Sequence, residues 1–153
     1  MRKALMMSAA LLFVAALAAP LPGQESAVPK NIAAAFAQKS PKAEDVSWEE
    51  LDDVYIASFL AGDYYCDAFF DKAGAWMETS TIIDEADVPQ VVTAAVKAKY
   101  PNLDYFTSLV RSERPDGMVY FLGFEKGYDY ITLTVSDKGL ILDEAVESFD
   151  GND

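Results

Sequence analysis

The segment VPKNIAAAFAQKSP, residues 28–41, returns 60 positions later as VPQVVTAAVKAKYP, residues 88–101. Six of the fourteen aligned positions are identical, and they include both prolines of each copy. Apolar side chains recur four residues apart, at Ile32 and Phe36 in the first copy and at the matching valines of the second, which places them on one helical face. Each copy therefore predicts a short amphipathic helix that a proline ends.

Acidic residues precede the second helix. Asp87 is positioned to cap this helix and Gln90 to close a capping box, whereas the first copy has Ala27 at the place of Asp87 and lacks the box. Asp84, Glu85 and Asp87 could instead suggest calcium, but their spacing fits no twelve-residue calcium loop. Because the dipole of a helix favours acids at its amino terminus, we expect no metal site here.

After each helix the apolar residues alternate with a period of two, and turns interrupt them at regular intervals. This predicts strands at 45–50, 54–60, 64–70 and 75–82, and again at 105–112, 118–125, 128–135 and 140–146. Hairpin-length turns make the sheet antiparallel, and the segregated helices make the fold class α+β. We expect two tandem repeats, at about 26–84 and 86–147, to form one sheet of about eight strands with both helices on one face.

The opposite face of such a sheet would be open. In the strand at 128–135, the aliphatic row that suits packing on a helix is Ile131, Leu133 and Val135, and the opposing row is Tyr128, Tyr130, Thr132 and Thr134. The candidate partner contacts on the open face are Tyr128, Tyr130, Tyr65, Phe69, Trp48 and Trp76. Tyr and Trp are enriched in protein interfaces, although cross-strand pairing on a half-exposed sheet would explain these aromatics equally well.

Composition excludes several function classes. The 153 residues include 25 acidic and 12 basic side chains, no His and one Cys, for a net charge of -13. Without His there is no Ser-His-Asp triad, Cys-His pair or HExxH zinc helix. The negative charge disfavours nucleic acid and membrane surfaces. Acid pairs such as Asp52 and Asp53 lie at expected turns and are common by chance, so we expect no catalytic residues and no cofactor.

The first 23 residues have the pattern of a secretory signal peptide and its junction. Arg2 and Lys3 precede an apolar run at 4–19 that ends in the small-x-small pattern of 16–18. The run is too short for a membrane span, so we expect a periplasmic or secreted protein with residues 24–153 as one domain. Its single cysteine, Cys66, has no internal disulfide partner, and its place in an apolar strand row favours a buried side chain over a reactive thiol.

Taken together, several motifs resemble the PepSY-like family of bacterial exported proteins. They are the two Val-Pro helices, Val46-Ser47-Trp48, Tyr55-x-Ala57-x-Phe59 and Phe70-Asp71-x-x-Gly74-x-Trp76-x-Glu78. The family is grouped by fold with the β-lactamase inhibitor protein. The resemblance, from about Val28 to Ala145, implies an exported protein whose sheet binds another protein, as the inhibitor does and as PepSY modules are proposed to do with peptidases.

That resemblance carries no site residues over, because the family has no agreed catalytic or binding residues. The inhibitor has disulfides within its repeats and this chain has one Cys, so a β-lactamase in particular is not the expected target. We expect an exported, non-enzymatic module that binds a protein, either a basic one or a hydrolase, through its open sheet face. Two alternatives stay open, which are a periplasmic sensor or carrier of a small ligand or cation, and a purely structural module.

Overall fold

The computed structural model describes residues 28–149, so the expected signal peptide at 1–23 lies outside the described residues. The first group of elements is α1 (Lys30–Lys39), β1 (Glu44–Leu51), β2 (Val54–Ala61), β3 (Tyr64–Asp71) and β4 (Trp76–Ile82). The second group is the 3-10 turn η1 (Glu85–Asp87), α2 (Gln90–Lys99), β5 (Ser108–Arg114), β6 (Gly117–Lys126), β7 (Asp129–Ser136) and β8 (Ile141–Ser148). No helix within residues 28–149 is long and apolar enough to cross a membrane.

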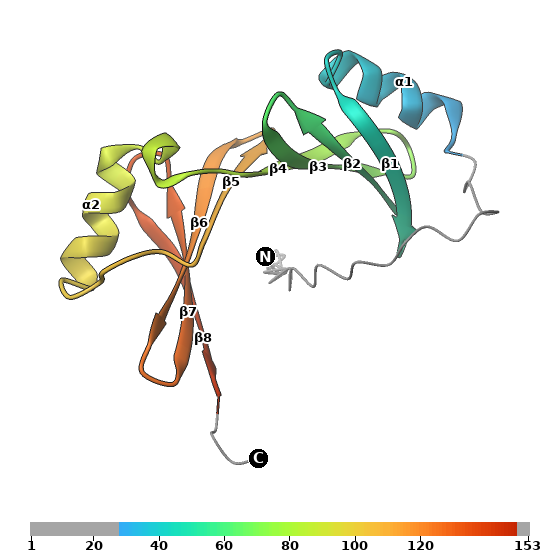
Figure 1. Ribbon diagram of the computed structural model, residues 1–153. Coiled ribbons are helices and arrows are strands. Elements are labelled where there is room, and N and C mark those ends of the chain that lie inside the picture. Colours follow the sequence, from blue (N-terminus) through green and yellow to red (C-terminus); the bar gives the residue numbers. More distant parts are fainter. Residues whose placement is uncertain (1–27, 150–153) are drawn as a thin grey trace, which may run out of the picture.

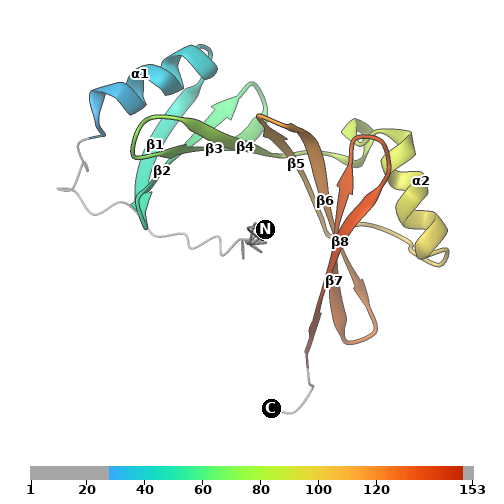
Figure 2. The same cartoon turned by 180° about the vertical axis from the view of Figure 1, so that it is seen from behind.

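All eight strands form one antiparallel sheet in which they follow one another in sequence order, from β1 to β8. The sheet bends between its two halves. Helix α1 lies over the first four strands and α2 beside the last four, both on the outer side of the bend (Figures 1 and 2). The predicted α+β class and the placement of both helices on one face are confirmed, and the inner side of the bend is the open face.

In the first repeat the core lies between α1 and the row of small and aromatic residues on β2 and β3. Ile32 is fully buried, and Phe36 makes edge-to-face ring contacts with Phe59 at 5.2 Å and with Phe70 at 6.3 Å between centroids. Cys66 belongs to this core and is 6% exposed, as the strand alternation predicted. The aromatic cluster supplies packing beyond what buried area alone would give.

The second repeat has the same plan with aliphatic side chains. Val92 and Val96 of α2 are fully buried against the predicted helix-facing row of β7, which is Ile131, Leu133 and Val135. At the end of α2, Tyr100 packs on Phe124 with a centroid distance of 4.8 Å. Its hydroxyl donates a hydrogen bond to Glu144 of the edge strand β8, and Lys99 donates another to the same carboxylate. These contacts hold the carboxyl-terminal end of α2 against the edge strand β8.

Two local predictions are wrong. Asp87 does not cap α2; its carboxylate closes a capping box with Asp84 around η1, and the N-cap of α2 is Pro89, which makes no side-chain cap. Strand β5 begins at Ser108 and not at residue 105, because Leu103 and Phe106 pack into the second core from a loop, while Tyr105 between them is 63% exposed. The spacing of three residues between the two packed side chains is not the period of two of a strand.

The two repeats join where β4 pairs with β5. This ladder has four residue pairs, from Thr79 opposite Glu113 to Ile82 opposite Val110, and it is the shortest in the sheet. On the helix side, Lys39 of α1 reaches across to Glu113, with 2.8 Å between Nζ and Oε1. The same Nζ lies 3.6 Å from the centroid of the Trp76 ring, so a cation–π contact and an ion pair hold Lys39 over the junction.

Replacing Phe36 with Ala should lower the free energy of unfolding by about 3–5 kcal/mol, because it leaves a cavity between α1 and the sheet. Urea denaturation followed by Trp fluorescence measures the change. The matched control is Gln38→Ala at an exposed position of the same helix, for which we expect a change below about 0.5 kcal/mol. Equal stability of Phe36→Ala and the parent protein would contradict this packing.

Burial and the hydrogen bond to Glu144 raise the pKa of Tyr100 from 10.0 to about 12. The stability that this shift contributes is fully present below pH 10.0 and is lost as the pH rises toward about 12, because the unfolded chain releases the phenol proton first. The difference in unfolding free energy between the parent and Tyr100→Phe should therefore decrease across this pH range. A difference that stays constant with pH would show that the hydroxyl titrates alike in both states.

Candidate protein-binding face

The register of the sheet decides which side chains reach the open face, because directly opposed residues of an antiparallel pair lie on the same face. Ser58, Asp67, Ser80 and Ser112 oppose one another in turn from β2 to β5, and they form a row of small polar residues across the middle of this face. Larger side chains flank the row. On one side they are Ile56, Phe69, Glu78 and Arg114, and on the other Leu60, Tyr65, Ile82, Val110 and Phe121.

A small cavity opens over this row. Its volume is about 200 Å³, and it is lined by Ser58, Phe59, Tyr65, Cys66, Asp67, Ser80, Ile82 and Val110. The lining comes from β2, β3, β4 and β5, so the cavity straddles the junction between the repeats. Asp67 is the one ionisable carboxylate among these residues, and it is half-buried.

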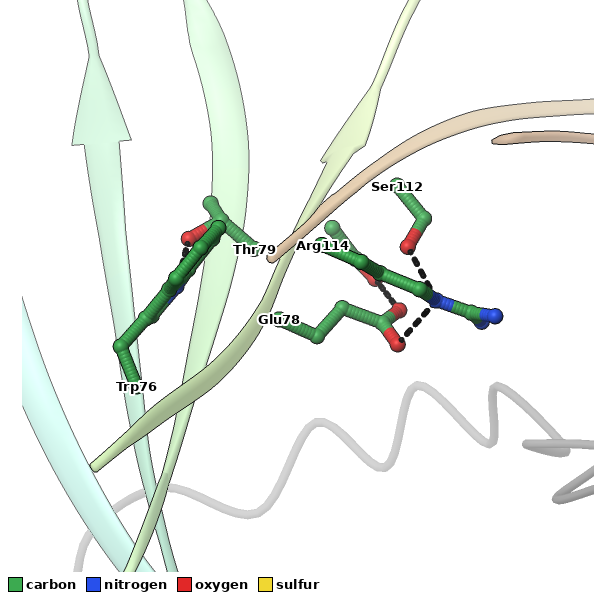
Figure 3. Close-up of polar contacts among 6 residues, drawn as sticks. Trp76, Glu78, Thr79, Ser112 and Arg114 are labelled. Carbon is green, nitrogen blue, oxygen red and sulfur yellow. Dashed lines mark hydrogen bonds and ion pairs between the residues drawn. The ribbon is translucent and has the colours of Figure 1, made fainter. Parts of the chain in front are cut away.

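Next to the cavity, an ion pair bridges the two repeats on the open face (Figure 3). The Nε of Arg114 lies 2.9 Å from Oε2 of Glu78 and donates a second hydrogen bond, of 3.2 Å, to Oγ of the fully buried Ser112. Ser80 donates to the other oxygen of Glu78 at 2.8 Å. The network therefore joins β4 to β5 through side chains as well as through the backbone ladder.

Three of the predicted contact residues lie on the open face. Tyr65 is 68% exposed, and Phe69 is half-buried on the same strand. Tyr130 of β7 lies over Gly123, where an added methyl group would overlap the tyrosine hydroxyl. Tyr128 is 79% exposed but sits in the turn before β7, which begins one residue later than predicted.

Trp48 and Trp76 were expected on the open face, and this placement is wrong. Trp48 opposes Ala57 and faces α1, with 5.2 Å between its ring centroid and that of Phe36. Trp76 opposes Phe70 across a register shift and so lies on the helix side. Its Nε1 donates a hydrogen bond of 2.9 Å to Thr79, as Figure 3 shows. Both rings pack against the first core, so they are unavailable to a partner on the open face.

Sequence reasoning missed the polar centre of this face. The signal for Asp67 was present, because the alternation that placed Tyr65 and Phe69 opposite the buried row also places the residue between them there. No pattern in the sequence indicated Arg114, because the predicted strand ended at residue 112. Nothing in the sequence indicated that Arg114 pairs with Glu78. Their contact depends on the register between two repeats, which neither repeat encodes alone.

Comparison with known proteins agrees with this architecture. The family model described as "Putative beta-lactamase-inhibitor-like, PepSY-like" matches residues 53–143. No curated protein matches the chain. A BLIP-like protein from Bacteroides fragilis NCTC 9343 superposes with a TM-score of 0.72, over 88% of this chain and 92% of that one, at 23% identity.

Two further solved structures are similar over most of their length. A DUF2874 family protein from Bacteroides uniformis ATCC 8492 gives a TM-score of 0.71 at 19% identity, over 77% of this chain and 88% of that one. One from Bacteroides eggerthii DSM 20697, described as "putative periplasmic proteins", gives 0.71 at 17% identity over the same shares. At these identities the likeness establishes the fold alone. Because the family model matches more than half of the chain, this chain belongs to the PepSY-like, beta-lactamase-inhibitor-like family.

Proposed function

We propose that this chain is an exported, non-enzymatic and inhibitor-like module that binds another protein on its open sheet face. The observation that carries the proposal is the continuity of that face. It runs across both repeats on the inner side of the bend, and neither helix lies on it (Figure 1). A sheet whose backbone bonds are already made presents a preformed surface, so binding costs little ordering of the chain.

The composition of the open face supports the proposal. Tyr65 and Ile82 are 68% and 42% exposed, and Phe69 and Phe121 are half-buried beside them. Large side chains of this kind surround the polar network of Glu78 and Arg114. Interfaces commonly place aromatic anchors around a few satisfied polar groups, and a handful of such anchors supplies most of the affinity.

Charge favours a basic partner. If Arg2 and Lys3 leave with the expected signal peptide, 10 basic and 25 acidic residues remain, for a net charge of -15. A field of one sign steers oppositely charged partners to the surface and speeds their association. The proposed exported location agrees with the description of the Bacteroides eggerthii relative as periplasmic.

The cavity favours a protein over a small ligand. Pockets for small ligands and cofactors usually have volumes of about 300–1,000 Å³. The cavity at Asp67 has about 200 Å³, which suits a single side chain of a partner. We therefore place the small-ligand sensor second to the protein-binding module.

Photo-crosslinking from two matched positions tests the proposal. A benzophenone amino acid at Ile82, on the open face, should crosslink one discrete protein in the native envelope, to be identified by mass spectrometry. The control is the same amino acid at Val91 on α2, because the two aliphatic side chains are 42% and 48% exposed. Equal yields at both positions, or no adduct at Ile82 in repeated experiments, would overturn protein binding by the open face.

A second variant separates binding from folding. Tyr65→Ala should reduce the crosslinked product from Ile82 about fivefold or more, as loss of an aromatic contact worth about 1 kcal/mol or more would do. Because Tyr65 is 68% exposed, the melting temperature should change little. If melting and capture fall together, Tyr65 serves the fold and is not a partner contact.

A further inference from the structure

Three of the residues that line the cavity on the open face, Ser58, Asp67 and Ser80, carry hydrogen-bond acceptors. The hydroxyl of Ser58 donates its proton to Oδ1 of Asp67 at 2.6 Å, and the hydroxyl of Ser80 donates its proton to Oε1 of Glu78 at 2.8 Å. A hydroxyl has one proton to donate and keeps lone pairs that accept. Ser58 and Ser80 can therefore accept from a bound group but not donate to it.

Asp67 adds a negative charge to these acceptors. None of the ion pairs within residues 28–149 uses its carboxylate, and its hydrogen bond to Ser58 occupies Oδ1. A half-buried carboxylate is partly removed from water, so a cation that reaches it forms a stronger contact than at a fully exposed acid. The free acceptor is Oδ2 of Asp67. Ser58 and Ser80 oppose Asp67 on the two neighbouring strands, so their hydroxyl oxygens lie on either side of it.

The walls of the cavity are apolar. The side chains of Tyr65 and Ile82 line it from the first repeat, and Val110 lines it from the second. A lysine side chain has a matching division, with an apolar four-carbon stem and a charged end. Its stem would pack along the aliphatic and aromatic walls while its ammonium group reaches the floor.

We propose that this cavity receives the side chain of a lysine from the partner protein, with its ammonium group on Asp67, Ser58 and Ser80. An ammonium group carries three donors and no acceptor, which matches three acceptor side chains. A guanidinium group prefers both oxygens of one carboxylate, and at Asp67 one of these oxygens already accepts a hydrogen bond from Ser58 and has fewer lone pairs left for a second donor. This assignment rests on the proposed protein-binding function. In it, Asp67 is the residue that selects a lysine of the partner.

Titration of the full chain with Nα-acetyl-lysine methylamide, followed by amide shifts in NMR, tests the recognition of the ammonium group without a partner. Saturable shifts should appear at Asp67, Ser80 and Val110. Asp67→Asn, which keeps the shape of the side chain and an acceptor for Ser58, should weaken the apparent affinity about tenfold or more. The matched control is Glu125→Gln, an exposed acid on the open face of β6, which should leave the affinity unchanged.

Two other probes limit the interpretation. The norleucine analogue has the stem without the charge and should cause no saturable shift, and the arginine analogue should bind more weakly than lysine. Equal responses to lysine and norleucine, full affinity in Asp67→Asn, or tighter binding of arginine would each overturn the lysine assignment. A thermal melt of Asp67→Asn that matches the parent protein shows that the variant is folded.

Crosslinking from Phe121, which lies on the open face but does not line the cavity, in the Asp67→Asn background separates this inference from the proposed function. The lysine assignment predicts that this variant captures less of the partner than Glu125→Gln does. Undiminished capture would overturn the lysine assignment and leave protein binding standing. If the lysine probe binds but no protein is captured, the proposed binding of a partner protein would be overturned. The cavity would then be a site for small primary amines.

Discussion

The short ladder between β4 and β5 is the contact on which the rest of this structure depends. Without it the chain would be two small sheets, each covered by one helix of ten residues. Four residue pairs make the join, and the backbone amide of Ile83 extends it by donating to the carbonyl of Leu109 at 3.1 Å. The join turns two half-surfaces into one face that crosses the repeats.

Ion pairs lie on both sides of this ladder. They contribute more to fixing the register between β4 and β5 than to the free energy of unfolding. Lys39 and Glu113 pair on the helix side, and Arg114 and Glu78 pair on the open side. Partly exposed pairs usually contribute about 0–1 kcal/mol each. A slip of β5 by one residue, however, would exchange its two faces, which would break both pairs and move the buried Ser112 to the helix side. The charged pairs therefore specify one alignment of the repeats.

The sequence predicted the architecture because the features that decide it are local and repeated. The Val-Pro helices, their buried positions such as Ile32 and Val92, and the alternation around Cys66 each follow from spacing within one segment. The same alternation correctly placed Tyr65 and Phe69 opposite the buried row. Helix and strand periodicities carry this information without any knowledge of the partner strand.

The features that could not be predicted from the sequence depend on how the strands align with one another. The register shift between Phe69 and Phe70 turns Trp76 toward the helix, and the ladder to β2 does the same for Trp48, although neither follows from local alternation. The cavity at Asp67 and the pair of Glu78 with Arg114 require four strands from both repeats to be in place. Local alternation alone places Asp67 on the open face, but only the alignment of strands from both repeats brings Glu78 and Arg114 together beside it.

The junction between β4 and β5 should hold the two repeats as one preformed face. Double electron–electron resonance tests this directly by measuring the distance between two nitroxide labels. The labels are attached at Asp63→Cys and Lys138→Cys in a Cys66→Ala background. Both label sites are exposed turn positions, one in each repeat, and the native cysteine is buried. A single narrow distance distribution is the predicted result. A broad or two-peaked distribution in the free protein would contradict a rigid junction and a preformed face.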